Sequence, residues 1–213
     1  MMSEVQARTA SKQTRVRLLD AAREVFSQHG FQGATVREIC RRAKANVAAV
    51  NYHFGSKDGL LSEALNFASL KAMQNANVTA SECPKKRLSL FIHDFLLMLL
   101  DENNPSSQCQ IMARELAEPT SALEKIVREA IGPMHEFLSK LVREIIGKNA
   151  KEEDLRLCVH SILGQCLFYR HSQLVLQHLH PEIHFDSQEI EVIAEHITTF
   201  SMAGIKKFEA NHI

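Results

Sequence analysis

The segment between residues 46 and 57 contains side chains whose types and order suit contact with nucleic acid. Residues 47–49 are short and apolar, so a helix that carries them can bring its backbone close to base edges. The polar run 51–53 follows and can hydrogen-bond to base edges or phosphates. Lys57 comes directly after Ser56, a good N-cap, so its ammonium and the N–H groups of a helix start can hold one phosphate together. This segment is therefore a candidate DNA contact surface.

Helical periodicity predicts the elements that must hold this segment in place. Predicted helices cover residues 14–29, 35–43 and 47–53, and a fourth starts after residue 56 and runs into the seventies. Gly30 is expected to stop the first helix, and Thr35 is expected to form a capping box with Glu38 at the start of the second. Short helices separated by only a few residues are the arrangement of a three-helix head with a helix-turn-helix.

The rest of the chain also shows helical periodicity, and strand signals are nearly absent. Further predicted helices cover residues 88–99, 111–116, 119–147, 154–178 and 187–208. Ser121 and Glu124 form a second candidate capping box, and Pro133 should kink or end its helix locally. We therefore expect an all-α fold of about nine helices, with a DNA-binding domain over residues 1–62 and a larger helical domain over 63–213.

The formal net charge of zero hides an uneven distribution of charge. Residues 1–65 contain ten Lys or Arg and six Asp or Glu, a net charge of +4, so the remainder carries −4. The tail residues Arg8, Lys12 and Arg15 could follow a DNA backbone or enter a minor groove. A basic N-terminal segment on a mildly acidic body favours a DNA-binding head, because phosphate neutralisation supplies much of the affinity for DNA.

Several other classes of protein are disfavoured. The five cysteines are scattered without a CxxC pair, which favours reduced thiols over a zinc site. The polar N-terminus is unlike a signal peptide, and no run approaches the roughly 20 apolar residues of a membrane helix. We therefore expect a cytoplasmic protein with no membrane partner. No nucleophile motif, HExxH pair or glycine-rich phosphate loop is present, so we expect no enzyme, no cofactor and no metal.

The run TVREICRRAKANVAAVNYHFGSKDGLL, residues 35–61, resembles the helix-turn-helix of the tetracycline-repressor-like (TetR/AcrR) family of bacterial transcriptional regulators. The family's order of an aromatic-rich helix end, Phe, a two-residue turn, Lys, an acid and a leucine pair occurs at Tyr52, His53, Phe54, Gly55, Ser56, Lys57, Asp58, Leu60 and Leu61. The resemblance covers about residues 13–65, and the string NVAAVNYHFGSK resembles one subgroup.

Three positions depart from the commoner family pattern: Lys44 stands where the turn usually has Gly, Ala45 replaces Val, and Asn51 replaces Tyr. We expect a left-handed or otherwise strained turn at Lys44 and an altered choice of bases at Asn51. The resemblance and the side-chain chemistry together imply these DNA contacts: Thr35, Arg37, Asn46, Val47, Ala48, Ala49, Asn51, Tyr52, His53 and Lys57. Residues expected in the core instead are Ile39, Val50, Phe54, Leu60 and Leu61. For Arg41 and Arg42 the alternative to a DNA contact is a simple solvated helix face.

The resemblance further implies a homodimer through the last two helices, bound to a palindromic double-stranded DNA operator and released by a small-molecule effector of unknown identity. Candidate dimer contacts are Leu163, Leu167, Leu174, Val175, Ile190, Ile193, Ile197 and Phe200, although half of them could face the subunit's own core. Polar and aromatic residues on apolar helices are the candidate effector pocket: His93, Phe95, Met98, Met112, Arg114, Glu115, Phe137, Gln165, Phe168 and Tyr169. Arg114 and Glu115 can equally form a structural ion pair.

Two alternatives come from other functional classes. His178, His180 and His184 lie close together with Asp186, which suggests a metal-dependent enzyme, although polar residues are common in such a proline-containing connection. A helical adaptor that uses its head to bind protein is the second alternative, and a steep salt dependence of DNA affinity would separate it from a DNA-binding regulator. The interpretation that fits most residues is a ligand-responsive transcriptional repressor, with activation not excluded.

Overall fold

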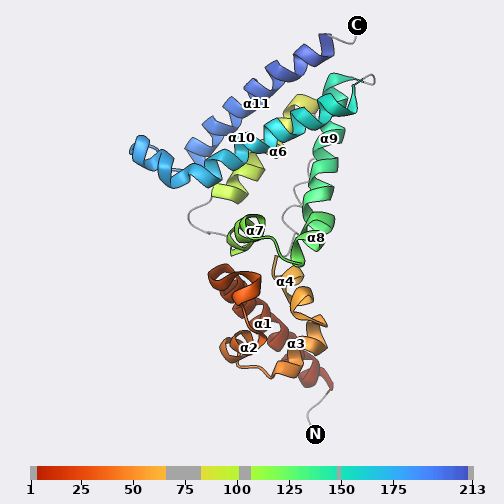
Figure 1. Ribbon diagram of the computed structural model, residues 1–213, viewed down its shortest axis with the longest axis vertical. Coiled ribbons are helices and arrows are strands. Elements are labelled where there is room, and N and C mark those ends of the chain that lie inside the picture. Colours follow the sequence, from red (N-terminus) through yellow and green to blue (C-terminus); the bar gives the residue numbers. More distant parts are fainter. Residues whose placement is uncertain (1–3, 66–82, 101–106, 148–149, 211–213) are drawn as a thin grey trace. The chain divides into compact units, whose positions relative to one another are not determined.

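A computed structural model of the chain describes residues 4–65, 83–100, 107–147 and 150–210 (Figure 1). Every regular element in these ranges is helical, which confirms the all-α prediction. The helices group into two compact units, and each is described separately below. Within the described residues, no helix is long and apolar enough to cross a membrane.

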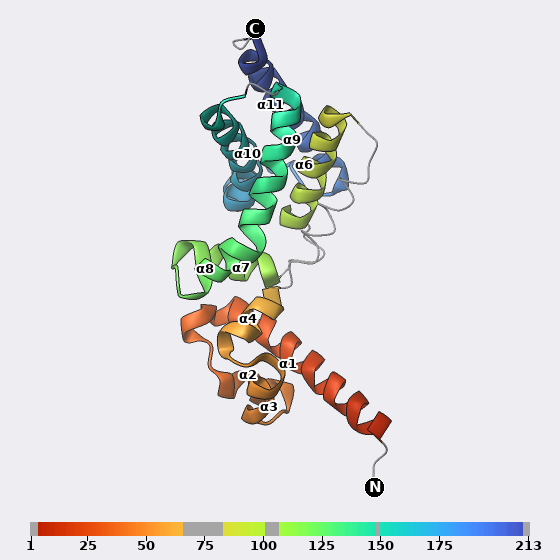
Figure 2. The ribbon, with the colours of Figure 1, turned by 90° about the vertical axis from the view of Figure 1, so that its right-hand side faces the viewer.

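The first unit contains the predicted head and two later helices. Its elements are α1 (Glu4–Gly33), α2 (Val36–Ala43), α3 (Val47–Phe54), α4 (Lys57–Leu65), α7 (Ser107–Ala117) and α8 (Ala122–Ile126). The long α1, red in Figure 2, packs against α2, α4 and α7. Its residues Leu18, Ala22, Val25 and Phe26 are buried and form the apolar stripe that faces the core of the unit.

Helix α1 starts ten residues before the predicted start, at Glu4. Gly30 has φ 65° and ψ 179°, values that favour glycine, and it interrupts the helix as predicted, although helical turns resume to Gly33. Arg8 and Lys12 lie on this helix, which is too thick at about 10–12 Å to enter a minor groove about 6 Å wide, so only their side chains could reach into the groove. Both roles expected for the tail residues stay predictions.

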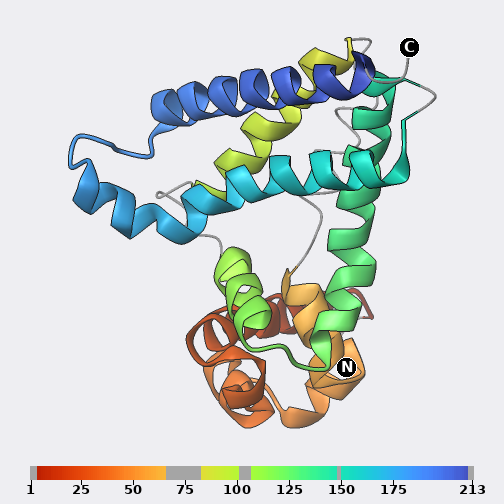
Figure 3. The same cartoon turned by 45° about the horizontal axis from the view of Figure 1, so that its top comes forward.

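The second unit consists of four helices that all contact one another: α6 (Pro84–Leu100), α9 (Gly132–Ile146), α10 (Glu152–Leu179) and α11 (Ser187–Ala210). Figure 3 shows α10 and α11, in cyan and blue, joined by the connection that follows residue 179. The core contains the apolar face of α6, including Leu88, Phe91, Ile92 and Phe95.

A π-helical turn, η1 (Val127–Ile131), joins α8 to α9. Pro133 lies in the first turn of α9 and has no N–H to donate to the carbonyl of Glu129, so the regular hydrogen-bond pattern has to change just before it. This confirms the interruption predicted at Pro133. The capping box predicted for Ser121 and Glu124 is wrong, because Ser121 makes no capping bond and Thr120 Oγ1 accepts the Ala122 N–H at 3.2 Å instead.

The compact units are not consecutive halves of the chain. Residues 107–129 group with the N-terminal helices, because α7 packs on α1 and α8 packs on α4. The predicted division between residues 62 and 63 lies just before residues 66–82, which are outside the described ranges, and it stays a prediction.

Candidate nucleic-acid interface

Helix α2 is fixed to the head by one apolar face. Ile39, Cys40 and Ala43 are buried, and Thr35 at the N-cap accepts the Glu38 N–H at 3.2 Å. The predicted capping box is therefore half formed, since the Glu38 carboxylate is hydrogen-bonded to arginines instead. Arg37, on the opposite side of the helix, is exposed.

The turn between α2 and α3 has the left-handed conformation expected at Lys44, with φ 50° and ψ 49°. The following Ala45 N–H donates to the Cys40 carbonyl at 2.9 Å, and the Cys40 thiol donates to the Asn46 carbonyl with a sulfur–oxygen distance of 3.7 Å. Asn46 then caps α3, because its Oδ1 accepts the Ala48 N–H at 2.9 Å. These bonds set the start of α3 relative to α2.

Helix α3 has two distinct faces. Val50 and Phe54 are buried, as predicted, and attach the helix to the head. The opposite face exposes Val47, Ala48, Asn51 and Tyr52, and the Tyr52 side chain is 80% exposed. Ala49 is half-buried, as is His53, whose ring meets the edge of Tyr52 at 4.8 Å between centroids. The structure thus gathers the residues predicted from 46 to 53 on one short helix and its cap.

Lys57 is the first residue of α4 and is half-buried. Its Nζ lies 4.4 Å from the centroid of the Phe31 ring. Burial lowers the pKa of Lys57, while the neighbouring Asp58 carboxylate acts in the opposite direction. Ser56 caps α4, since its Oγ accepts the Gly59 N–H at 3.0 Å.

Several basic residues of the head are held by carboxylates. Glu38 accepts hydrogen bonds from Arg41 and Arg42, which lower its pKa to about 2. Arg15 forms an ion pair with Glu63 and lies over the Phe54 ring. Sequence reasoning missed the Glu38 network, although carboxylate and guanidinium groups three and four residues apart on a helix are its usual signal.

The residues predicted for an effector pocket are divided between the two units. Met112, Arg114 and Glu115 belong to α7 in the first unit, and the other seven belong to the second unit. Glu115 is buried and accepts the Thr120 N–H at 2.7 Å and its hydroxyl at 2.6 Å, so it fixes the turn after α7. In the second unit, Phe95 is buried in the core and Phe168 is exposed.

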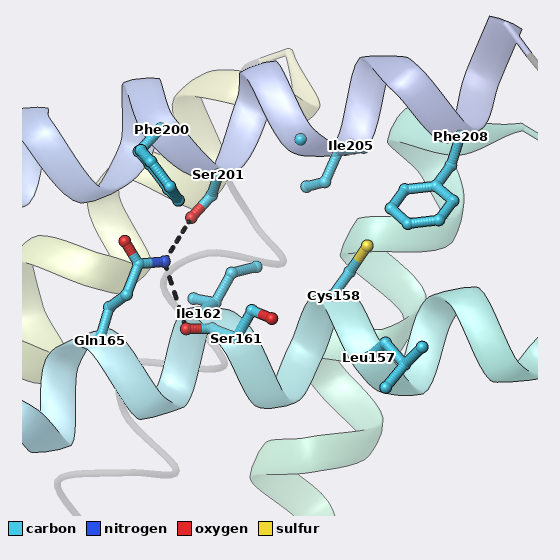
Figure 4. A pocket seen from close by; sticks show the side chains of 10 residues that line it. Leu157, Cys158, Ser161, Ile162, Gln165, Phe200, Ser201, Ile205 and Phe208 are labelled. Carbon is cyan, nitrogen blue, oxygen red and sulfur yellow. Dashed lines mark hydrogen bonds between the residues drawn. The ribbon is translucent and has the colours of Figure 1, made fainter.

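The remaining predicted pocket residues lie at different places in the second unit. His93 is half-buried with Nδ1 3.2 Å from the Asp94 carboxylate, and Phe137 packs against Phe91. Met98 and Tyr169 are partly buried against the core. Gln165 donates to the Ser161 carbonyl and the Ser201 hydroxyl, each at 3.2 Å, in a groove of about 150 Å³ between α10 and α11 (Figure 4).

The eight candidate dimer contacts divide into three groups by exposure. Ile190, Ile193 and Ile197 are buried in the core of the second unit, which agrees with the alternative that part of the set faces the subunit's own core. Leu163 and Leu167 are half-buried, and the exposed members are Leu174, Val175 and Phe200.

No group of three or more potential metal ligands occurs within the described ranges. His178 Nδ1 donates to the Leu174 carbonyl at 2.7 Å, and His180 Nδ1 lies 3.6 Å from a Glu182 carboxylate oxygen. The histidines near residue 180 are therefore not gathered as a metal site would require.

Comparison with known proteins covers both parts of the chain. Residues 18–64 match the model of bacterial regulatory proteins of the tetR family, and residues 84–205 match the C-terminal domain of the HTH-type transcriptional dual regulator CecR. CecR of Shigella flexneri is 25% identical over 88% of this chain and 89% of its own length. The repressor NicS of Pseudomonas putida is 33% identical over 43% of this chain and 45% of its own.

Solved structures agree with the fold. The transcriptional regulator FadR from Bacillus subtilis superposes with a TM-score of 0.66 at 15% identity, covering 89% of this chain and 98% of FadR. The head with its exposed α3, the all-helical second unit and both family matches lead to one conclusion: this chain belongs to the tetR family of bacterial transcriptional regulators, which bind DNA and are not enzymes, and it has a C-terminal domain of the CecR type.

Proposed function

We propose that this protein is a repressor that binds a palindromic operator as a homodimer and is released from it by a small molecule. The observation that carries the proposal is the two-faced helix α3, which is anchored by Val50 and Phe54 and exposes its other face. A short helix with small residues at its start can enter a major groove with its backbone close to the bases.

The exposed face gives each predicted contact a specific role. Val47 and Ala48 offer methyl groups to thymine, and Asn51 and Tyr52 offer hydrogen-bonding groups to base edges or phosphates. Arg37 is exposed on α2, and its guanidinium suits the paired acceptors of guanine. These assignments predict which substitutions change sequence preference and which only weaken binding.

Phosphate contacts come from the helix starts of the head. Thr35 and Asn46 cap α2 and α3, so their backbone N–H groups and the partial positive charge of each helix start can meet phosphates. Lys57 adds an ammonium at the start of α4. Ala49 and His53 line the edges of the exposed face, where they are half-buried.

The homodimer is proposed through α10 and α11. These helices expose large apolar side chains on the outside of the second unit: Phe168, Leu174, Val175, Val192 and Phe200. Exposed large apolar residues on two helices of a regulator that reads two half-sites about 34–36 Å apart are best explained by contact with a second copy of the chain. Replacing Phe200, which is 64% exposed, by Glu should shift the protein from dimer to monomer in analytical ultracentrifugation.

The effector is proposed to act on the second unit, in the cytoplasm where its operator lies. Phe137 is half-buried and packs against Phe91, which stacks on Phe95, so this part of the second unit offers apolar surface to a ligand. FadR was solved with stearoyl-CoA, which makes acyl-CoA thioesters one part of a screening panel. A true effector should raise the melting temperature of the free protein. It should also lower the affinity for the operator, and the operator should lower the affinity for the effector by the same factor.

The central test is binding of the purified protein to the DNA upstream of its own gene, measured by fluorescence anisotropy at several salt concentrations. We expect tight binding that falls steeply with salt, and Arg37→Ala should lose about 1–3 kcal/mol and relax the preference at one base pair. Lys140→Ala, which removes an exposed cation of the second unit, is the matched control and should bind as the wild type does. Weak binding that is independent of salt would favour the adaptor alternative.

A further inference from the structure

Two aromatic residues of α1 and the first residue of α4 form a stack inside the head. Nζ of Lys57 lies 4.4 Å from the centroid of the Phe31 ring, within the ~6 Å at which a ring face attracts a cation. Phe31 in turn stacks on Phe26, with 6.1 Å between the ring centroids and 26° between the ring planes. Phe26 is fully buried. The Phe26–Phe31–Lys57 stack therefore connects a surface cation to the rigid core of the head.

This stack holds a cation at a position that electrostatics alone disfavours. Lys57 opens α4, and the start of a helix carries a partial positive charge that repels an ammonium. Lys57 is also half-buried, and its burial lowers its pKa. The neighbouring Asp58 opposes these effects, and the Phe31 ring provides a second favourable contact. Without the ring, a flexible Lys would be expected to extend away from the helix start into water.

We propose that Phe31 is a positioning residue for DNA binding: its ring holds the Lys57 ammonium beside the start of α4, where the ammonium and the helix N–H groups meet one phosphate. The proposal rests on the DNA contact proposed for Lys57 and adds a residue that need not touch DNA. The ring covers one side of the ammonium, and the remaining N–H donors stay available to a phosphate oxygen. A Lys that is already ordered loses less rotamer freedom when it binds.

Stepwise fluorination of Phe31 tests the proposal, because fluorine weakens the negative ring face while it changes the ring volume little. Mono-, di- and trifluoro-phenylalanine at position 31 should raise the dissociation constant of the operator duplex progressively, to about two- to fivefold for the trifluoro ring. Phe31→Leu should weaken binding at least as much, while Phe31→Tyr, which keeps an electron-rich ring, should bind as the wild type does. The same fluorination series at Phe26, whose ring contacts Phe31, is the matched control and should leave operator affinity unchanged.

The Lys57→Met variant separates this proposal from the DNA-contact role on which it rests. In that background the effect of fluorination at position 31 should vanish, because no cation remains over the ring. Unchanged affinity along the series, together with weak binding by Lys57→Met, would overturn the role of Phe31 and keep the DNA contact of Lys57. Wild-type affinity in Lys57→Met would overturn both.

A measurement on the free protein tests the positioning without DNA. Protons beside the Lys57 ammonium lie over an aromatic face, so their NMR signals should be shifted upfield by the ring current and should return to ordinary values in Phe31→Leu. Signals at ordinary values in the wild type would show that the ring does not hold the ammonium in solution and would overturn the proposal. Retained melting temperatures in the fluorinated variants would exclude loss of folding as the cause of weaker binding.

Discussion

Lys44 offers a sharp test of how the helix-turn-helix is built. Among the described residues it is the only non-glycine residue with a positive φ, and its φ of 50° and ψ of 49° end α2 in the left-handed region. An L-residue with a Cβ pays about 1–2 kcal/mol for that conformation. Lys44→Gly removes this cost, but glycine also raises the conformational entropy of the unfolded chain. That increase offsets about 0.5–1 kcal/mol of the gain. We therefore expect Lys44→Gly to stabilise the protein by about 0.5–1 kcal/mol.

The Lys44→Ala variant is the matched control, because it removes the charge and keeps the Cβ. Its stability should lie within about 0.5 kcal/mol of the wild type, since an exposed side chain is lost and the backbone strain stays. For a chain of this size, the gain in Lys44→Gly corresponds to a rise in melting temperature of about 1–4 °C. Urea unfolding followed by circular dichroism gives an independent measure. Equal stabilities of the glycine and alanine variants would refute the argument from left-handed strain.

Operator binding by the same two variants separates charge from backbone geometry. Both lack the Lys44 ammonium, so both should lose the same affinity if Lys44 neutralises a phosphate, and the slope of log K against log salt should become shallower by about 0.9. The hydrogen bond from Ala45 N–H to the Cys40 carbonyl should persist in both, because either backbone can adopt the turn. A large difference in operator affinity between the glycine and alanine variants would show that the turn itself shifts during binding.

Three further outcomes follow from the structure. Gly30→Ala should destabilise the head by about 1–3 kcal/mol in urea unfolding, because φ 65° with ψ 179° is a conformation that almost only glycine adopts. Exposed Cys83 should react with a maleimide in the native protein at pH 8, whereas Cys166, whose pKa burial raises to about 12, should react only after unfolding. Because the folded-state pKa of Glu38 is lowered, its hydrogen bonds to arginine should stabilise the head at pH values above the ordinary carboxyl pKa. This stabilisation should be lost as the pH falls toward 2. Glu38→Gln should therefore make the free energy of unfolding depend less on pH over that acidic range.

Features that depend on a few neighbouring residues could be predicted from the sequence. The N-cap at Thr35 and the interruption at Pro133 follow from local geometry that the residue type itself restricts. The left-handed turn at Lys44 is expected from the resemblance instead, because Gly is the usual residue at that position. The earlier start of α1 was missed because its first ten residues have no apolar stripe, and helical periodicity has nothing to detect in a polar helix.

Features that depend on tertiary packing could not be predicted in the same way. Sequence does not reveal that α7 and α8 pack with α1 and α4, since no local signal links segments that distant. In α11, apolar residues lie both on the buried side, as at Ile193, and on the exposed side, as at Val192 and Phe200. Apolar residues on both sides of a helix do not reveal from sequence which of them face the core of the protein.

The charge of the head shows how the structure changes a conclusion drawn from composition. Four of its ten cations, Arg15, Arg23, Arg41 and Arg42, form ion pairs with carboxylates of the same unit. At most six cations per head then remain for phosphates, which limits the salt slope to about −5 per half-site instead of about −9 for ten. Arg37 and Lys44 are among these six and lie on α2 and the turn beside α3. A count of charges overstates the number of phosphate contacts, whereas the position of Arg37 and Lys44 next to α3 explains how a neutral chain can still bind DNA.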